Sequence, residues 1–338
     1  MKALSGLNLE ELEKVILSLD EKKFRAKQVL RWIYTKSASN FEQMTDVAKD
    51  LRAKLSSVAV ISDTKIKTRQ ISTDGTIKYL LEYQDGACTE TVLMRFDNRS
   101  NLTACVSSQV GCAMGCDFCA TGKCGLKRQL THGEIIEQIL TIQRDTGLKV
   151  TNVVFMGQGE PLANFENVYK AIELINNYLQ IGIRRITVSS CGIVPLIYEM
   201  CERKLVPTLA ISLHSACSAQ RAEIMPVERK YNLDKLREAL NFYTSKTGDR
   251  VTIEYVLLGG YNDTKECALK LCEYISEIKC NVNLIPYNQV SGTKYQKPKQ
   301  KDVMTFKYLL ETSGKKVTVR LERGADIDAA CGQLAGKE

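Results

Sequence analysis

From about residue 104 onward, short β-branched apolar segments alternate with longer segments whose apolar residues recur at helical spacing. This alternation predicts a parallel sheet, because parallel neighbours need a crossover connection and a helix supplies it. The expected strands are 151–156, 184–189, 206–212, 251–258, 281–286 and 316–320. The expected helices are 132–145, 165–179, 232–246, 264–278 and 300–312. The count favours an α/β fold with an open, partial (β/α)6 barrel over a doubly wound sheet, with chemistry at the carboxyl ends of the strands.

The residues before the barrel divide into two parts. Apolar stripes predict three helices at 7–19, 21–35 and 41–55, the last capped by Asn40, which together make a small helical module over residues 1–60.

Residues 61–100 are expected to form a β-rich connector. Its strands are predicted at 64–71, 77–83 and 89–95, and Asp74-Gly75 and Asp85-Gly86 between them are hairpin turn signals. The barrel with its C-terminal segment then takes up residues 101–338.

The cysteine content needs a chemical explanation. The N-terminus MKALSGLNLEELEK lacks the apolar region of a secretory signal, and no apolar run approaches the ~20 residues that span a bilayer. We therefore expect a cytoplasmic protein, whose thirteen cysteines are not a disulfide framework because the cytosol keeps thiols reduced. The net charge of +8 is compatible with a polyanionic partner, and equally with a basic protein that never binds RNA.

Three cysteines, Cys112, Cys116 and Cys119, form the motif C-x3-C-x2-C directly after the first barrel strand. Three thiolates on one short loop can hold three irons of a 4Fe-4S cluster and leave the fourth iron open to S-adenosylmethionine (SAM). The alternative is a structural zinc site completed by Cys124, but zinc sites normally pair this kind of motif with a second one downstream, and none exists here. The spacing favours the iron–sulfur interpretation.

Six ordered segments, together with the N-terminal stretch FRAKQVLRWIYTK, extend this interpretation to almost the whole chain. They are CVSSQVGCAMGCDFCATG (105–122), VVFMGQGEPLANF (153–165), ITVSSCGIVPLI (186–197), LAISLHS (209–215), NLIPYN (283–288) and RGADIDAACGQLAG (323–336). This set resembles the RlmN/Cfr family of radical SAM rRNA adenine methyltransferases, and more closely its RlmN branch. The resemblance implies methylation of adenine C2 in 23S rRNA and in certain tRNAs, whereas the Cfr branch methylates C8 and confers antibiotic resistance.

The resemblance also implies the roles of three residues and the use of two SAM molecules per turnover. Cys331 takes a methyl group from one SAM and carries it as S-methylcysteine. A radical from the second SAM, cleaved at the cluster, removes hydrogen from that methyl group, which then adds to the adenine carbon. Glu90 is the proton acceptor for the ring hydrogen. Cys105 finally attacks the sulfur of Cys331, which frees the base and leaves a transient disulfide.

The SAM-binding positions are likewise carried over from the family. They are Gly159, Glu160, Ser189, Ser212, Leu213, His214 and Asn288. Serine and asparagine at strand ends are also common turn caps, and a lone histidine is often a core residue, so each position has a structural alternative. The family further implies an electron donor such as flavodoxin or ferredoxin, and we expect a monomer without a membrane partner.

Several basic clusters, and no single motif, are the candidates for RNA binding. Basic clusters occur at Lys127-Arg128, Arg184-Arg185 and Arg229-Lys230, and at 294–301 beside Tyr287 and Tyr295. Such groups can neutralise phosphates and stack bases, and solvated surface charge is the equal alternative for any single pair. The target base must leave its stack to reach a buried site, and the N-terminal helical module is a candidate for holding the RNA.

The sequence departs from the family pattern at a few positions. Gln158 replaces a usual methionine, Cys191 a serine and Glu228 an asparagine, and the stretch 95–104 is long and lacks a proline. The length of this stretch affects how Glu90 aligns with the family's proton acceptor, and with it the choice of C2 over C8. The eight cysteines outside the motifs are expected to be packing residues.

Two alternatives to C2 methylation stay open. The first is the same chemistry at adenine C8. The second is a non-catalytic, metal-stabilised RNA-binding protein, which would hold zinc and leave SAM intact.

Overall fold

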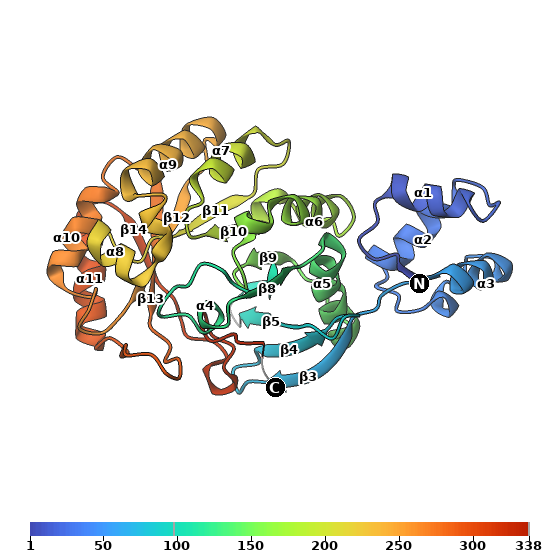
Figure 1. Ribbon diagram of the computed structural model, residues 1–338, viewed down its shortest axis with the longest axis horizontal. Helices are drawn as coiled ribbons and strands as arrows, with labels where there is room; N and C mark the ends of the chain where they lie inside the picture. The colour runs from blue at the N-terminus through green and yellow to red at the C-terminus, as the bar shows by residue number, and fades with distance from the viewer. Residues whose placement is uncertain (97–98, 337–338) are drawn as a thin grey trace.

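The computed structural model, which describes residues 1–96 and 99–336, is built around one ten-stranded sheet (Figure 1). Seven strands of this sheet are parallel, and each lies beside the one before it in that sheet: β6 (Arg99–Cys105), β9 (Asn152–Phe155), β10 (Ile186–Ser190), β11 (Thr208–Ser212), β12 (Val251–Leu257), β13 (Cys280–Pro286) and β14 (Lys316–Val319). The order never reverses, whereas a doubly wound sheet reverses at its switch point. The partial barrel predicted from the sequence is therefore confirmed, and β6 precedes the six expected strands as a seventh parallel strand.

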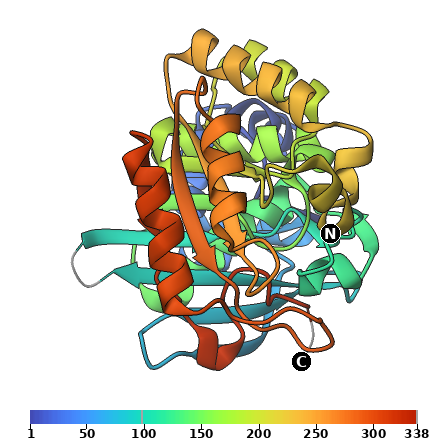
Figure 2. The ribbon, with the colours of Figure 1, turned by 90° about the vertical axis from the view of Figure 1, so that its left-hand side faces the viewer.

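The connecting helices cover the outside of this curved sheet: α5 (His132–Thr146), α6 (Phe165–Asn177), α7 (Val194–Glu202), α9 (Leu233–Thr247), α10 (Lys265–Tyr274) and α11 (Gln300–Thr312). In Figure 2 the last two lie in front of the sheet. α5 shows why these helices form where they do, because Thr131 and Glu134 make a capping box at its start and Gly147 ends it in a left-handed conformation. α7 and the shorter α8 (Ser218–Ile224) and α4 (Ala120–Lys123) were not among the predicted elements.

The β-rich connector continues the same sheet. Its strands β3 (Lys65–Ile71), β4 (Ile77–Glu82) and β5 (Cys88–Phe96) run antiparallel, and β5 pairs with β6 so that Val92 faces Cys105. Both predicted hairpin turns are present, with Gly75 and Gly86 at positive φ. Residues 97–98 of the long stretch between Glu90 and Cys105 lie outside the described residues.

The N-terminal module contains α1 (Leu9–Leu17), α2 (Arg25–Tyr34) and α3 (Lys49–Val58). The predicted third helix, 41–55, is wrong in extent. Asn40 caps only a 3-10 turn at Phe41–Gln43, and α3 begins six residues after that turn. The bend between them is held by Asp46, whose carboxylate accepts a hydrogen bond from the Trp32 indole. The apolar face is buried as expected, but two segments supply it.

This module packs against α5 and α6 (Figure 1). Lys170 of α6 pairs with Glu11 of α1 at 2.6 Å, and the hydroxyl of Tyr178 accepts a hydrogen bond from the backbone N–H of Leu9. The ring of Tyr178 also stacks on Tyr34 of α2, with centroids 5.3 Å apart. A two-strand parallel pair, β1 (Lys2–Ala3) with β2 (Ala59–Val60), closes the module.

Residues 320–336, which we call the strap, connect the two open edges of the sheet. The strap leaves β14 at one edge and reaches the β3–β4 turn at the other, where the carboxylates of Asp74 and Asp326 bind the backbone N–H of Gly324 and the hydroxyl of Ser72. It then passes α4, where the hydroxyl of Thr121 donates to the carbonyl of Leu334 at 2.6 Å. The strap therefore lies across the carboxyl ends of the strands.

Among the described residues, no helix is both long and apolar enough to cross a lipid bilayer.

Candidate active site

A cavity opens at the carboxyl ends of the parallel strands, beneath the strap. Its walls come from the cysteine loop, from the loop after β9, from the ends of β10 to β13 and from the strap. The lining residues used below are Cys112, Cys116, Cys119, Met156, Gly159, Glu160, Ser189, Ser212, His214, Glu254, Arg320 and Cys331. Most of the predicted site residues therefore meet in one place.

The three motif cysteines lie on a loop between β7 (Gln109–Gly111) and β8 (Leu126–Gln129), which form a separate antiparallel hairpin. Burial raises the pKa of Cys112 to about 11 and also raises that of Cys116, and each neighbouring thiol adds to the effect. Cys124 is exposed, and it does not line the cavity.

The arrangement of these thiols bears on the choice between cluster and zinc. A structural zinc site needs four ligands, and Cys124, the candidate for the fourth, does not line the cavity with the other three cysteines. A 4Fe-4S cluster places each thiolate on a different iron, so its ligands line a common cavity without converging on one atom. Three cysteines that share a cavity in this way fit a cluster better than zinc.

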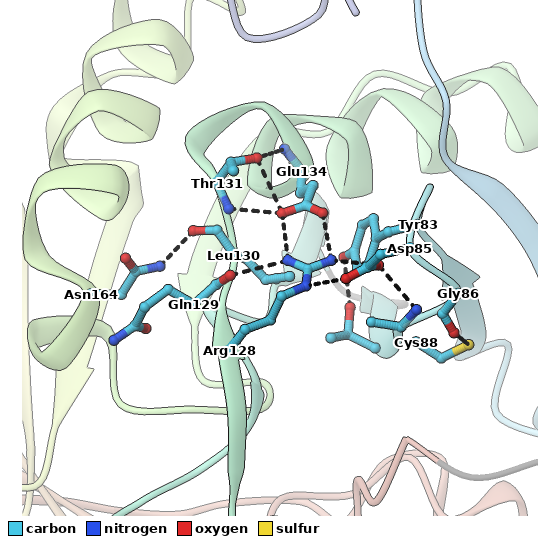
Figure 3. Close-up of polar contacts among 12 residues, drawn as sticks. Tyr83, Asp85, Gly86, Cys88, Arg128, Gln129, Leu130, Thr131, Glu134 and Asn164 are labelled. Atoms are coloured by element: carbon cyan, nitrogen blue, oxygen red, sulfur yellow. Dashed lines mark hydrogen bonds and ion pairs between the residues drawn. The ribbon is translucent and has the colours of Figure 1, made fainter.

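Arg128 holds the base of the cysteine hairpin in place (Figure 3). Its guanidinium makes two hydrogen bonds to Asp85 in the β4–β5 turn, at 2.6 and 2.9 Å, and two to Glu134 at the start of α5, at 3.0 and 2.8 Å. It also lies over the ring of Tyr83. Because two carboxylates bind its guanidinium, Arg128 has a structural role in this arrangement and is not an open phosphate site.

Glu160 fits the ammonium group of SAM. Its side chain is only 4% exposed, and its two oxygens accept hydrogen bonds from the backbone N–H groups of Leu162 and Cys191. Burial raises the pKa of this carboxyl, and among the described residues no lysine or arginine pairs with it. A buried carboxylate held only by neutral donors favours a bound cation. Gly159 beside it has φ of 98°, and an added Cβ would lie 2.5 Å from the side chain of Gln109.

His214 is a buried hydrogen-bond donor to the cavity. Its Nδ1 accepts the backbone N–H of Val256, so in the neutral ring the proton is on Nε2. Burial lowers the pKa of His214 to about 3, and the nearby Arg221 guanidinium adds to this, so the ring is neutral at physiological pH. Ser189 and Ser212 line the same cavity from the ends of β10 and β11.

Two of the predicted SAM residues do not line the cavity. Leu213 is fully buried, and its carbonyl accepts a hydrogen bond from the Nε of Arg221. Asn288, after β13, donates from its side-chain amide to the carbonyl of Cys331 at 3.3 Å. In this arrangement Asn288 contacts the strap.

The two cysteines with predicted covalent roles come from different elements, Cys105 from β6 and Cys331 from the strap. Cys331 lines the cavity from the strap, and Cys105 ends β6, only 6% exposed, in a small apolar cluster with Leu334 and Ala329 of the strap. Burial raises the pKa of Cys105 to about 12, the nearby Cys331 adds to this, and the Arg320 guanidinium opposes it. Both cysteines are free thiols.

Glu90 lies outside this cavity. It is 3% exposed on β5, and its carboxylate pairs with Lys78 at 2.9 Å and accepts the backbone N–H groups of Ala335 and Gly336 at 2.7 and 2.8 Å. It faces a second, polar groove on the other side of the strap. Gln158, one of the departures, accepts a hydrogen bond from the backbone N–H of Glu90 through its side chain.

Sequence reasoning missed two charged residues of the cavity, Glu254 and Arg320. Glu254 is buried on β12 and accepts a hydrogen bond from the side chain of Asn283. Arg320 follows β14, at the same carboxyl edge as the predicted site residues. A charged residue directly after an apolar strand was the available signal, and it was present in KVTVR.

Comparisons with known proteins agree with this geometry. Residues 2–61 match the ribosomal RNA large subunit methyltransferase N-terminal domain, and residues 106–272 match the radical SAM superfamily. The chain is 44% identical to a probable dual-specificity RNA methyltransferase RlmN of Thermoanaerobacter sp. (strain X514), over all of this chain and 98% of that protein. It is 43% identical to the protein of the same name in Bacillus licheniformis, over 99% of this chain and 94% of that one.

A solved structure gives the same result for the fold. The crystal structure of a radical SAM methyltransferase from Sphaerobacter thermophilus superposes with a TM-score of 0.96 at 38% identity, covering the whole of both chains. The family resemblance inferred from the motifs is confirmed. The chain belongs to the RlmN family and is a radical SAM RNA methyltransferase.

Proposed function

We propose that this enzyme methylates C2 of an adenine in 23S rRNA, and in tRNA, through an S-methylcysteine at Cys331. The observation that carries the proposal is that Cys331 lines the same cavity as the three motif cysteines and Glu160. The full-length similarity to proteins named dual-specificity RNA methyltransferases supports the choice of substrates.

A cysteine carrier suits this target because C2 of adenine has no lone pair to attack a SAM methyl group. A thiolate is a competent nucleophile for that methyl group, and the carbon can then be delivered by radical chemistry. In this proposal Cys112, Cys116 and Cys119 hold one 4Fe-4S cluster, and Glu160, Ser189, Ser212 and His214 surround SAM. When bound, these cofactors supply the electron and the hydrogen-abstracting radical.

The chain's own residues handle the base once the carbon has bonded to it. Glu90 accepts the proton from the adenine ring as the adduct gives up its unpaired electron, for which the bound cluster would be the acceptor. Cys105 then forms a disulfide with the sulfur of Cys331. The bond from that sulfur to the new carbon breaks with its electron pair on the carbon, which takes up a proton and becomes the methyl group. Because the strap already occupies one oxygen of Glu90 and Lys78 the other, residues 335–336 must move away before Glu90 can act.

The polar groove beside Glu90 is our candidate for the approach of RNA. Lys78, Lys123 and Lys127 line it together with Glu90 and Gln158. Lysines at a groove mouth can hold phosphates while the target base is extracted toward the cavity. The N-terminal module adds exposed basic residues on one helix, Lys27 and Arg31 of α2. We propose that it holds the RNA on the far side of α5.

The remaining parts of the proposal follow from the family. We propose a cytoplasmic enzyme that works as a monomer and takes electrons from a donor such as flavodoxin or ferredoxin.

The position of the methyl group is the decisive measurement. Enzyme reconstituted with iron and sulfide under anaerobic conditions is incubated with SAM, a reductant and unmodified 23S rRNA fragments. We expect fragmentation mass spectrometry of the digested nucleosides to show 2-methyladenosine. A product methylated at C8 contradicts the C2 assignment and leaves the radical mechanism in place. An enzyme that binds the RNA and leaves SAM intact contradicts catalysis altogether.

Removal of individual cysteines distinguishes the cluster from a zinc site. Cys112→Ser, Cys116→Ser and Cys119→Ser are each expected to lose most cluster iron and the associated visible absorption, because each thiolate holds one iron. Cys124→Ser is the matched control and is expected to keep full occupancy, since it lies off the cavity. If Cys124→Ser loses its metal as completely as the others, and that metal is zinc, the cluster assignment is wrong.

A further inference from the structure

Arg221 is a fully buried arginine on α8. Its Nη1 pairs with a carboxylate oxygen of Glu228 at 2.6 Å, and Glu228 is itself only 3% exposed. The other oxygen of Glu228 accepts hydrogen bonds from the hydroxyl of Ser218 and from the backbone N–H of Leu233. Because both oxygens of this carboxylate are bound, Glu228 holds the guanidinium in one orientation.

The other nitrogens of this guanidinium bind backbone carbonyls at the ends of two neighbouring strands. Nη2 donates to the carbonyl of Cys191, directly after β10, at 2.8 Å, and lies 3.4 Å from the carbonyl of Ser212, which ends β11. Nε donates to the carbonyl of Leu213 at 3.0 Å. A guanidinium can make these contacts together because its five N–H donors lie in one plane with fixed directions. One side chain therefore joins the ends of β10 and β11.

The contact with Leu213 supports a strained turn at His214. The φ of His214 is 59°, in the left-handed region that residues other than glycine rarely adopt. The turn is closed by the backbone N–H of Ser215, which donates to the carbonyl of Leu213 at 2.8 Å. A strained backbone conformation persists only where the surrounding contacts hold it, and Arg221 binds this same carbonyl. Arg221 thus helps to fix the turn from which the ring of His214 reaches the cavity.

A second series of contacts leads from Arg221 to Glu160. The carbonyl of Cys191 accepts from Arg221, and the backbone N–H of Cys191 donates to Oε2 of Glu160 at 2.8 Å. The backbone of Cys191 is therefore held from both sides. A shift of this backbone would also change the direction of the Glu160 carboxylate.

We propose that Arg221 is a positioning residue for SAM, holding the ends of β10 and β11 so that Glu160 and His214 face the ligand. This inference rests on the proposed binding of SAM by those two residues. Glu228 fixes the guanidinium, and the guanidinium acts on the ligand only through the backbone that it binds.

The first measurement is the affinity for SAM of the full chain, reconstituted with iron and sulfide and kept without reductant so that SAM is not cleaved. In Arg221→Met we expect the Kd from equilibrium dialysis to rise about tenfold, because the contacts that hold both strand ends are lost. The iron content is expected to match the wild type, since the three motif cysteines are unchanged. In turnover, the KM for SAM should rise by a larger factor than kcat falls.

A second variant separates positioning from stability. Removing one partner of a buried ion pair is strongly destabilising, whereas replacing both with apolar side chains of similar size often is not. The double variant Arg221→Met/Glu228→Leu is therefore expected to have a Tm closer to the wild type than Arg221→Met has. Its affinity for SAM is expected to stay as weak as that of Arg221→Met. If the affinity returns together with the Tm, the pair serves stability alone and the inference is wrong.

Arg144→Met is the matched control. Arg144 of α5 pairs with Glu137, whose side chain is 2% exposed, so this variant also leaves a buried carboxylate without its arginine. We expect a lower Tm and an unchanged affinity for SAM. An equal loss of affinity in Arg144→Met would show that general destabilisation is sufficient, and would overturn the inference.

Glu228→Gln tests the same idea if Arg221→Met fails to fold. The glutamine can still accept the hydrogen bonds from Ser218 and Leu233, but its amide nitrogen cannot accept one from Arg221. We expect the Kd for SAM to rise about threefold. An unchanged Kd in Arg221→Met, or in Glu228→Gln where Arg221→Met does not fold, contradicts the inference.

Failure of the inference and failure of the proposed function give different results. Reconstituted wild-type enzyme that does not bind SAM contradicts the proposed function. Normal binding of SAM by the wild type, combined with an unchanged Kd in Arg221→Met, contradicts only the role of Arg221.

Discussion

Cys331→Ala is expected to abolish methylation of RNA. The alanine cannot accept a methyl group. Because adenine C2 has no lone pair with which to attack SAM directly, the enzyme then has no route to that carbon. Transfer of radiolabel from methyl-labelled SAM to RNA should fall by a factor on the order of 10³ or more, to the background of the assay. Cleavage of SAM by the reduced cluster should continue, because the three motif cysteines and Glu160 are unchanged.

The control for this variant is Cys272→Ala. Cys272 is partly buried on α10, on the outside of the barrel, and its thiol donates a hydrogen bond to the carbonyl of Leu309 on α11. We expect this variant to keep wild-type activity. Methylated RNA produced by the purified Cys331→Ala enzyme would remove the basis of the mechanism.

Cys105→Ala is expected to trap the enzyme on its RNA. The carbon can still be delivered, but the thiol that attacks the sulfur of Cys331 is missing, so protein and RNA stay joined through Cys331. Denaturing gel electrophoresis should show a slower band that contains both components and is sensitive to ribonuclease. Turnover should stop after about one event per enzyme.

The double variant Cys105→Ala/Cys331→Ala separates this trap from adventitious crosslinking. With no carrier sulfur, it is expected to form no joined species. Mass spectrometry of the digested complex should locate the nucleotide on residues 324–337. A joined species that persists in the double variant, or that maps to another cysteine, contradicts the role of Cys105.

Much of the fold could be predicted from the sequence because barrel strands carry strong local signals. The segments 251–258 and 300–312 read correctly because a β-branched run and an amphipathic repeat dominate them, and the structure places β12 at Val251–Leu257 and α11 at Gln300–Thr312. The prediction of 41–55 as one helix was wrong because an apolar stripe indicates which side chains are buried and does not show whether the helix is continuous. Two short segments that bury the same face give the same pattern.

The candidate site was predictable only in part. Residues at the ends of different strands, such as Ser189 of β10 and Ser212 of β11, meet because parallel strands share one edge, and sequence order alone gives that result. The contacts of Glu90 with Ala335, and of Arg128 with Asp85 and Glu134, join segments whose meeting depends on loop paths. The periodicity of apolar residues in the sequence does not predict such a path. The position of Glu90 outside the main cavity therefore required the three-dimensional structure.

The strap and the cysteine loop are joined by one backbone hydrogen bond with a thermodynamic consequence. Ala120, directly after Cys119, donates its N–H to the carbonyl of Gly332, directly after Cys331. Any ligand that orders one of these two segments lowers the free energy needed to order the other, and the effect is the same in both directions. Binding of the metal centre and docking of the strap are thus coupled, and we expect a protein without its cluster to expose the strap to proteases.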